Sequence, residues 1–194
     1  MERLLLTTFR RGSAFGFYRP RFHLLERFRD GPSSGRCGRR WSRGDIAFLA
    51  TIQNSLDDRD DPQDIDKSVA GYLFFAPNFY LARDEKDVMV DPFQHMIPDI
   101  APSLFFVGES DPQLPVSQKL GFALKKTGAR ADLLVSNKMG HWFLTDKNWC
   151  DYALFESDRF LYCLGILSGP PLVKKPPGFG FNPAKSVTDG QVDY

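Results

Sequence analysis

Two side chains in this 194-residue sequence have the types and positions that acid–base chemistry needs, and they are Asp111 and His141. Asp111 follows the apolar run Ser103–Val107, and His141 follows the apolar run Ala131–Ser136. A carboxylate beside an imidazole fixes the tautomer of the ring and stabilises the imidazolium formed during acyl transfer. Taken singly, each residue could be an ordinary turn or loop residue. Their placement after two matching strands favours a catalytic pair.

Apolar runs and amphipathic stretches alternate along the chain in the order of a parallel sheet covered by helices. Strands are predicted at Val69–Ala76, Ser103–Val107 and Ala131–Ser136, and helices at Ile46–Ile52, Pro115–Thr127 and Lys147–Leu167. The predicted fold class is therefore α/β. Ligands of such sheets bind at the carboxyl ends of the strands. Asp111 and His141 are expected to emerge there, with Glu109 and Ser110 shaping the turn between them and the sheet.

Three short motifs stand in a fixed order in the second half of the chain. Pro102–Pro115 reads Pro-x-Leu-Phe-Phe-x-Gly-x-x-Asp-x-x-Leu-Pro, Lys125–Gly128 reads Lys-x-x-Gly, and His141 stands between Gly140 and Trp142. In this order they resemble the C-terminal half of α/β-hydrolases of the esterase/lipase and dienelactone-hydrolase type, close to small acetyl- and feruloyl-esterases. The resemblance covers roughly half of the chain. It implies a partial α/β-hydrolase fold in which Asp111 orients His141, the general base.

The nucleophile is the point at which the sequence departs from that family. α/β-Hydrolases carry it in Gly-x-Ser-x-Gly between a strand and a helix, and they often place His-Gly-Gly upstream. No His-Gly-Gly occurs here. Ser42 directly precedes the first predicted helix and has Gly44 two residues later, although Arg40 replaces the first Gly. Ser33 lies in a literal match, Gly31–Gly35, that no apolar strand precedes. Either could be an ordinary loop serine, and we predict Ser42 rather than Ser33 as the nucleophile.

The distribution of charge divides the chain into unlike segments. Residues 1–44 carry 11 Arg and three acidic residues, a net charge of +8, whereas residues 45–194 carry −7. We expect an irregular Arg-rich segment at 1–44, the hydrolase-like part at 45–167 and a Pro-rich tail at 168–194 that is extended or disordered. A basic arm can bind nucleic acid. No nucleic-acid partner is expected, because the aromatic residues of the arm do not alternate with Arg in a recognisable module.

The remaining composition gives no reason to expect a cofactor, a metal or a membrane span. Three Cys residues make no disulfide framework, and Cys150 and Cys163 lie too far apart in one predicted helix to form a bond. No convincing signal peptide begins the chain, so the expected location is cytoplasmic by default. The strand at Val69–Ala76 has no evident neighbour in residues 1–44. Self-association through that exposed edge is therefore expected.

The function predicted from these observations is hydrolysis of a small-molecule carboxylic ester, in the manner of a serine esterase or lipase. Ser42 would attack the carbonyl carbon, His141 would act as base and then as acid, and Asp111 would orient His141. One alternative is a serine peptidase of the prolyl-oligopeptidase type. A second is a truncated, catalytically inactive hydrolase remnant, and a third is a binding module that uses the basic arm.

Overall fold

The computed structural model describes residues 43–53, 68–79 and 91–188 of the chain. The predictions for residues 1–42, which include Ser33, Ser42 and Cys37, concern residues outside this part. In chain order the helices and strands are α1 (Arg43–Ile52), β1 (Tyr72–Phe75), η3 (Pro92–Gln94), β2 (Ser103–Gly108), α2 (Leu114–Lys126), β3 (Ala131–Ser136), η4 (Phe143–Thr145) and α3 (Lys147–Cys163).

The described strands form one parallel sheet in the order β1-β2-β3. In its register Phe75 lies beside Phe106, and Gly108 lies beside Ser136. Every residue of β2 and β3 is buried, as expected for apolar strands covered on both faces. The prediction of an α/β fold, with parallel strands and covering helices, is confirmed.

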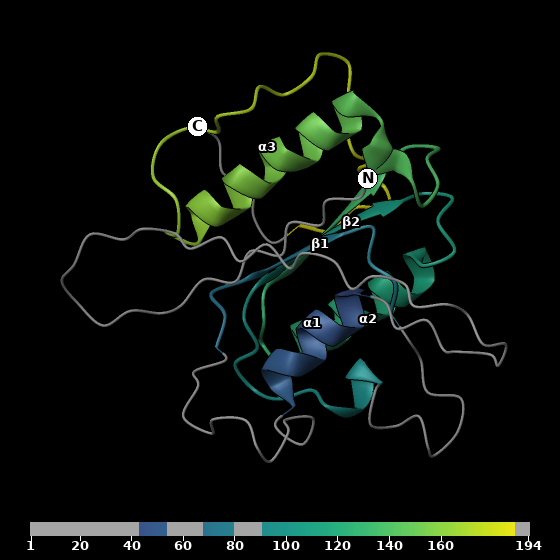
Figure 1. The fold of residues 1–194 in the computed structure, drawn as a ribbon. Helices are drawn as coiled ribbons and strands as arrows, with labels where there is room; N and C mark the ends of the chain where they lie inside the picture. The colour runs from purple at the N-terminus through teal and green to yellow at the C-terminus, as the bar shows by residue number, and fades with distance from the viewer. Residues whose placement is uncertain (1–42, 54–67, 80–90, 189–194) are drawn as a thin grey trace, which may run out of the picture.

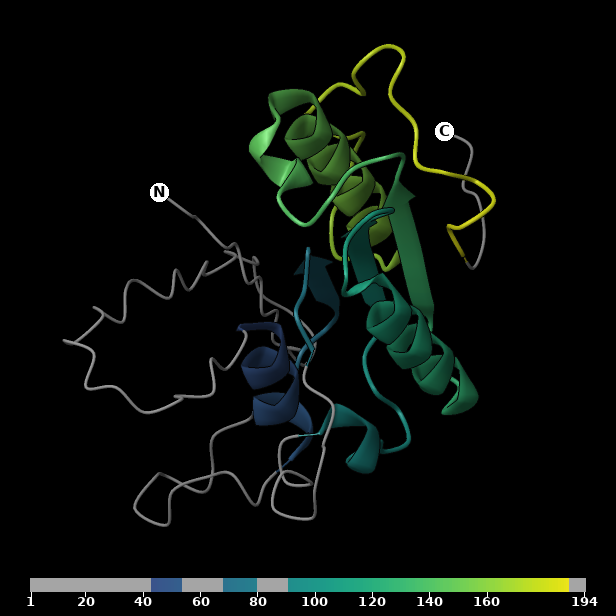
Figure 2. The ribbon, with the colours of Figure 1, turned by 90° about the vertical axis from the view of Figure 1, so that its right-hand side faces the viewer.

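Helices cover both faces of the sheet, with α1 and α2 on one face and α3 on the other (Figure 1 and, turned by 90°, Figure 2). Successive side chains of a strand point to opposite faces, and this alternation divides the core. Phe105 and Val107 of β2 pack with the α1 and α2 side. Leu104 and Phe106 pack with the α3 side.

The ends of α2 and α3 follow from capping residues in the sequence. Gly128, with φ of +87°, comes directly after the C-cap of α2. The side chain of Asp146 accepts hydrogen bonds from the backbone N–H groups of Asn148 and Trp149 and so begins α3. This helix ends at Cys163, four residues before the predicted end, because Gly165 adopts φ of +69° and stops it.

The first strand is also shorter than predicted, since β1 covers Tyr72–Phe75 rather than Val69–Ala76. Its ladder with β2 begins where Tyr72 lies beside Ser103. The residue before Ser103 is Pro102, which has no N–H to donate and cannot extend the ladder. At the other end, Ala76 adopts φ of +45° and turns the chain away from the sheet.

The described part of the C-terminal tail, residues 168–188, packs against the sheet. Leu133 and Val187 exchange two backbone hydrogen bonds, of 2.6 and 2.8 Å, in an antiparallel bridge beside β3. A second antiparallel bridge joins Ser136 and Phe181. Figure 1 shows this segment, in yellow, passing over α3 and returning to the sheet. The tail therefore covers the outer edge of β3.

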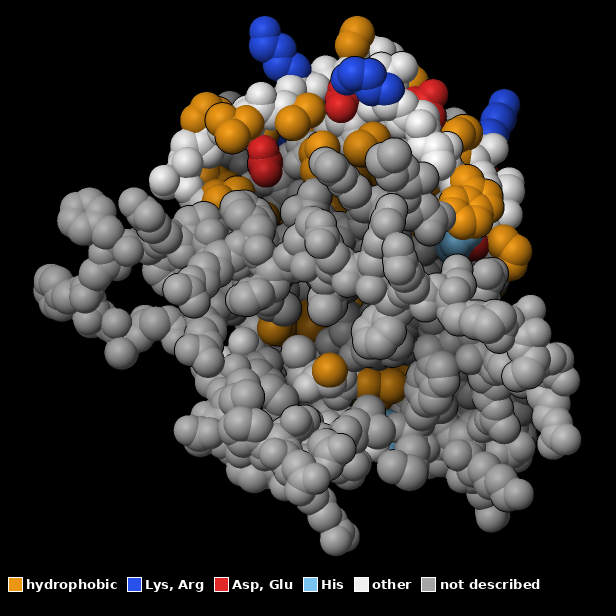
Figure 3. Space-filling model, in the orientation of Figure 1, with side chains coloured by type: hydrophobic (Ala, Val, Ile, Leu, Met, Phe, Trp, Pro, Cys, Tyr) orange, Lys and Arg blue, Asp and Glu red, His pale blue; other side chains and the backbone are white. Residues whose placement is uncertain are grey.

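At the top of the molecule in the view of Figure 3, the visible hydrophobic, basic and acidic side chains are interspersed. No helix within residues 43–53, 68–79 and 91–188 is long and apolar enough to cross a bilayer. Cys150 and Cys163, both on α3, are free thiols.

Candidate active site

A carboxylate and an imidazole meet at the carboxyl edge of the sheet. Because Gly108 and Ser136 lie side by side at the ends of β2 and β3, the turns that follow these strands lie together. Oδ2 of Asp111 lies 2.9 Å from Nδ1 of His141, within hydrogen-bond distance. The predicted proximity of these two side chains, across the ends of adjacent strands, is therefore confirmed.

A tight turn between β2 and α2 holds the carboxylate of Asp111. The backbone N–H of Asp111 donates to Gly108, at 3.1 Å, and that of Leu114 donates back to the Asp111 carbonyl, at 3.0 Å. Oδ1 of Asp111 accepts the backbone N–H of Gln113, at 2.8 Å. The side chain of Asp111 is fully buried, and both of its oxygens have hydrogen-bond partners. This arrangement fixes the direction in which Oδ2 points.

The turn that carries Asp111 and the loop that carries His141 are joined through their backbones. The N–H of Glu109 donates to the carbonyl of Ser136, at 3.0 Å, and the N–H of Ser110 donates to that of Met139, at 2.8 Å. The loop also packs directly against Gly108, where a β-carbon would lie 2.5 Å from the Met139 carbonyl oxygen. A side chain on Gly108 would therefore push the His141 loop away.

Glu109 adds a side-chain contact between the turn that carries Asp111 and the loop that carries His141. Its Oε2 accepts the backbone N–H of Lys138, at 2.7 Å, and Lys138 adopts φ of +57° at the start of the loop. Its Oε1 lies 2.9 Å from Nζ of Lys185, which comes from the tail. The hydrogen bond from Lys138, followed by that from Lys185, lowers the pKa of Glu109 below its usual value. The sequence indicated Glu109 as a turn residue but gave no sign of Lys185.

The His141 ring is accessible on one side. Its side chain is 31% exposed, and Nδ1 is the nitrogen that faces Asp111. Nε2 is therefore the nitrogen that can face a reacting group. The next residue, Trp142, is 66% exposed, and its ring meets the His141 ring edge-on with centroids 5.1 Å apart. Trp142 thus adds an exposed apolar surface beside the imidazole.

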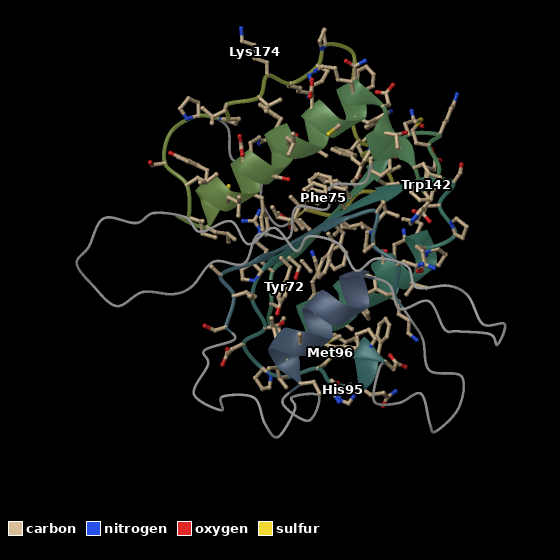
Figure 4. The ribbon with its side chains drawn as sticks, in the orientation of Figure 1. Tyr72, Phe75, His95, Met96, Trp142 and Lys174 are labelled. Carbon is tan, nitrogen blue, oxygen red and sulfur yellow. The ribbon has the colours of Figure 1, made fainter. Side chains whose placement is uncertain are left out.

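The predicted nucleophile, Ser42, is placed only by its neighbour in the sequence. Ser42 lies outside the described residues, but it directly precedes the first residue of α1, Arg43. The ring of Phe48 on α1 meets the ring of Tyr72 on β1, with centroids 5.3 Å apart, so α1 lies beside the first strand of the sheet. Figure 4 shows His95 beside α1 and well away from Trp142, so His95 is not part of the Asp111–His141 pair.

A cleft of about 410 Å³ lies between α3 and the tail, lined among others by Arg130, Asp132 and Glu156. It borders the start of β3 and so lies at the opposite end of the strand from His141. Among the described residues, no group of three His, Cys, Asp or Glu side chains could hold a metal ion.

The fold is similar to that of solved esterase structures from Thermogutta terrifontis. Esterase 2 phosphonylated by cyclosarin matches with a TM-score of 0.59 and 22% identity, over 65% of this chain and 53% of that one. A propionate-bound form gives a TM-score of 0.59 and 20% identity, over 65% and 54%. A butyrate-bound form gives 0.58 and 20%, over 64% and 54%.

The chain shares its fold with part of an esterase. It spans about half the length of the esterases that it matches. No protein-family model matches the sequence, and a comparison with curated proteins gave no match. The resemblance seen in the sequence is therefore supported at the level of the fold.

Proposed function

We propose that this protein hydrolyses carboxylic esters by acyl transfer to a serine, with Asp111 and His141 as the acid and the base of a triad. The observation that carries the proposal is the 2.9 Å hydrogen bond between the buried Asp111 carboxylate and Nδ1 of His141, at the carboxyl edge of the sheet. This bond fixes the tautomer that leaves Nε2 ready to accept a proton. In this proposal residues 45–167 form the hydrolase-like unit.

The proposed reaction proceeds through an acyl-enzyme. Nε2 of His141 accepts the proton of the Ser42 hydroxyl as its oxygen attacks the ester carbonyl, and the resulting intermediate expels the alcohol, which takes that proton. A water molecule then gives a proton to Nε2 as its oxygen attacks the acyl carbon. The bond from the acyl group to Ser42 breaks, the acyl group leaves as a carboxylic acid, and Nε2 of His141 returns the proton to the Ser42 oxygen. Asp111 holds the ring and stabilises its charged form during both steps.

Esters of short acyl chains are the proposed substrates. The fold neighbours include an esterase with propionate bound and the same esterase with butyrate bound. In this chain, Trp142 presents an exposed aromatic surface next to the His141 ring. A surface of this kind suits a small apolar acyl or alcohol group. We therefore expect p-nitrophenyl propionate and butyrate to be hydrolysed faster than esters of long fatty acids.

The test is covalent labelling with a fluorophosphonate probe, followed by peptide mapping. Labelling at Ser42 that is lost in His141→Ala and kept in His95→Ala would support the proposed triad. His95 is the matched control because it is also a half-buried histidine and lies elsewhere on the fold. Labelling at Ser33 would move the nucleophile and keep the class of reaction. Folded protein that is labelled at no serine and hydrolyses no ester would refute the proposal.

A further inference from the structure

The C-terminal tail makes a closed turn against the end of β3 that bears the candidate site. The backbone N–H of Asn182 donates to the carbonyl of Val135, at 2.7 Å, and Oγ of Ser186 accepts the N–H of Val135, at 2.9 Å. Between these two anchors, the Asn182 carbonyl accepts the N–H groups of Lys185 and Ser186, at 3.2 and 2.8 Å. The position of Lys185 is therefore defined by four hydrogen bonds of its own segment and of β3.

This turn places the side chain of Lys185 on Glu109. Nζ of Lys185 lies 2.9 Å from Oε1 of Glu109. The other carboxylate oxygen of Glu109 accepts the N–H of Lys138, at 2.7 Å. Glu109 therefore joins the tail to the loop that carries His141.

The contacts of Glu109 with Lys138 and Lys185 lie close to Asp111 and His141 along the chain. Glu109 stands two residues before Asp111, and Lys138 stands three residues before His141. Lys138 has a positive φ of +57°, a conformation that a non-glycine residue adopts only when its surroundings hold it there. The bond from its N–H to Glu109 is one contact that can hold it. A shift of Glu109 would therefore change the path of the His141 loop.

We propose that Glu109 is a positioning residue for His141, and that Lys185 of the tail completes the site by holding Glu109 in place. This inference rests on the proposed hydrolase function of the Asp111–His141 pair. It adds the C-terminal tail, which lies outside the predicted hydrolase-like unit, to the residues on which the reaction depends.

The ion pair between Glu109 and Lys185 should affect turnover and stability to different degrees. The Glu109 and Lys185 side chains are 21% and 46% exposed, and a solvent-accessible ion pair of this kind contributes little to stability. Catalysis is far more sensitive to geometry, since a misplacement of about 1 Å can cost a factor of about 100 in rate. Loss of the ion pair between Glu109 and Lys185 should therefore reduce turnover much more than it reduces stability.

The experiment compares Lys185→Met with Lys174→Met in the full-length chain. Lys174 is the matched control, because it is an exposed lysine of the same tail whose side chain extends into solvent (Figure 4). With p-nitrophenyl butyrate, we expect Lys185→Met to lower kcat about tenfold with KM within about twofold. We expect Lys174→Met to match the unaltered protein. Lys185→Arg should restore most of the rate, because the guanidinium can reach the same carboxylate.

Two readouts independent of activity accompany the kinetics. Amide hydrogen exchange at Lys138 should be several-fold faster in Lys185→Met and in Glu109→Ala, and the NMR chemical shifts of the His141 ring protons should change in both variants. About 1 M NaCl should reproduce part of the Lys185→Met effect in the unaltered protein, because the ion pair is solvent-accessible. The salt experiment keeps the test valid if Glu109→Ala does not fold.

The inference is overturned if Lys185→Met leaves kcat, amide exchange at Lys138 and the chemical shifts of the His141 ring unchanged. It is also overturned if Lys174→Met has the same effects as Lys185→Met. If the folded protein hydrolyses no ester, the proposed function fails by itself. The exchange and chemical-shift data then still decide whether the tail positions His141 through Glu109.

Discussion

A β-carbon on Gly108 would lie 2.4 Å from the carbonyl oxygen of Gly140, so the residue before His141 packs directly on the end of β2. Both partners in this contact are backbone, and backbone cannot rotate aside as a side chain can. We predict that Gly108→Ala lowers kcat/KM for a short ester about 100-fold by displacing His141. Overpacking should also lower the free energy of unfolding by about 1–3 kcal/mol, measured by urea denaturation.

Gly121→Ala is the matched control for this prediction. Gly121 is also buried, but it lies within α2, and nothing lies within 4 Å of its added β-carbon. Alanine in a helix interior should raise the free energy of unfolding by about 0.5–1 kcal/mol, with no change in turnover. If the two variants had the same kcat/KM, the contact between Gly108 and Gly140 would not position His141.

Replacing Asp111 with Asn tests the proposed role of the carboxylate. The amide can donate an N–H to Nδ1 of His141, which places the ring proton on Nε2 and removes the base. We predict that kcat for p-nitrophenyl butyrate falls by about 1,000- to 10,000-fold in Asp111→Asn, while KM changes little. The measurement is steady-state kinetics on protein whose folded fraction has been checked by circular dichroism.

Asp132→Asn is the control for loss of a buried carboxylate. The Asp132 side chain is 4% exposed, against 0% for Asp111, and it pairs with Arg130 at 2.6 Å. Removing its charge leaves a half-buried guanidinium without its partner and should destabilise the protein by about 3 kcal/mol. Its kcat per folded molecule should be unchanged. An equal loss of kcat in both variants would assign the effect of Asp111→Asn to stability.

The part of the fold that the sequence predicted best is the part with unambiguous local patterns. β3 has the predicted bounds, and β2 exceeds its predicted end by one residue. An unbroken apolar run that is buried on both faces has one clear interpretation once turn residues bound it. The placement of Asp111 beside His141 followed from the same rule, because parallel strands that neighbour each other bring their following turns together.

The contacts of the tail could not be predicted from local patterns. Phe181, Asn182 and Lys185 find their partners on β3 and on Glu109, far away in sequence, and no period in the tail indicates them. The shorter β1 likewise depends on a neighbouring strand, through Pro102. Such features are fixed by tertiary contacts, which a pattern along one segment does not contain.

Other expectations stay predictions. Ser42 as nucleophile and an irregular segment at 1–42 concern residues outside the described part of the chain. The prediction of an irregular segment was wrong for Arg43 and Gly44, which form the first turn of α1. Self-association through the outer edge of β1 also depends on what lies beside that edge. Size-exclusion chromatography with light scattering over a range of concentrations would test it, and a concentration-independent monomer would contradict it.

Phe181 anchors the tail in an aromatic cluster on the α3 side of the sheet. Its ring stacks on Tyr152 with centroids 4.7 Å apart and meets those of Trp149 and Phe106 at 5.6 and 5.8 Å. We predict that Phe181→Ala lowers the free energy of unfolding by about 2 kcal/mol, less than for a fully buried Phe. The amide of Val187, which bonds to β3, should exchange faster because the tail detaches more often.

The control for the tail anchor is Leu172→Ala. Leu172 belongs to the same tail and is 95% exposed, so its removal should change neither stability nor exchange at Val187. If Phe181→Ala behaved like Leu172→Ala, the aromatic contacts would not hold the tail on the sheet.

Glu156 on α3 gives a dependence on pH with a definite sign. Burial raises the pKa of its carboxyl above the usual 4.5, although Arg159, Lys175 and Tyr152, which face it, all act to lower it. Folding therefore favours the protonated form, so its stabilising effect is complete below about pH 4.5 and is lost as the pH rises through the folded-state pKa. We predict that Glu156→Gln is more stable than the unaltered protein at about pH 7, and that this advantage disappears at about pH 4. Urea denaturation at both pH values measures the difference.

Glu109→Gln is the informative contrast, because the lowered pKa of Glu109 predicts a loss of stability at neutral pH that shrinks as the solution is acidified. The opposite result would be a Glu156→Gln variant whose stability, relative to the unaltered protein, is lower at neutral pH than in acid. That result would show that the ion pair with Arg159 outweighs the cost of burial.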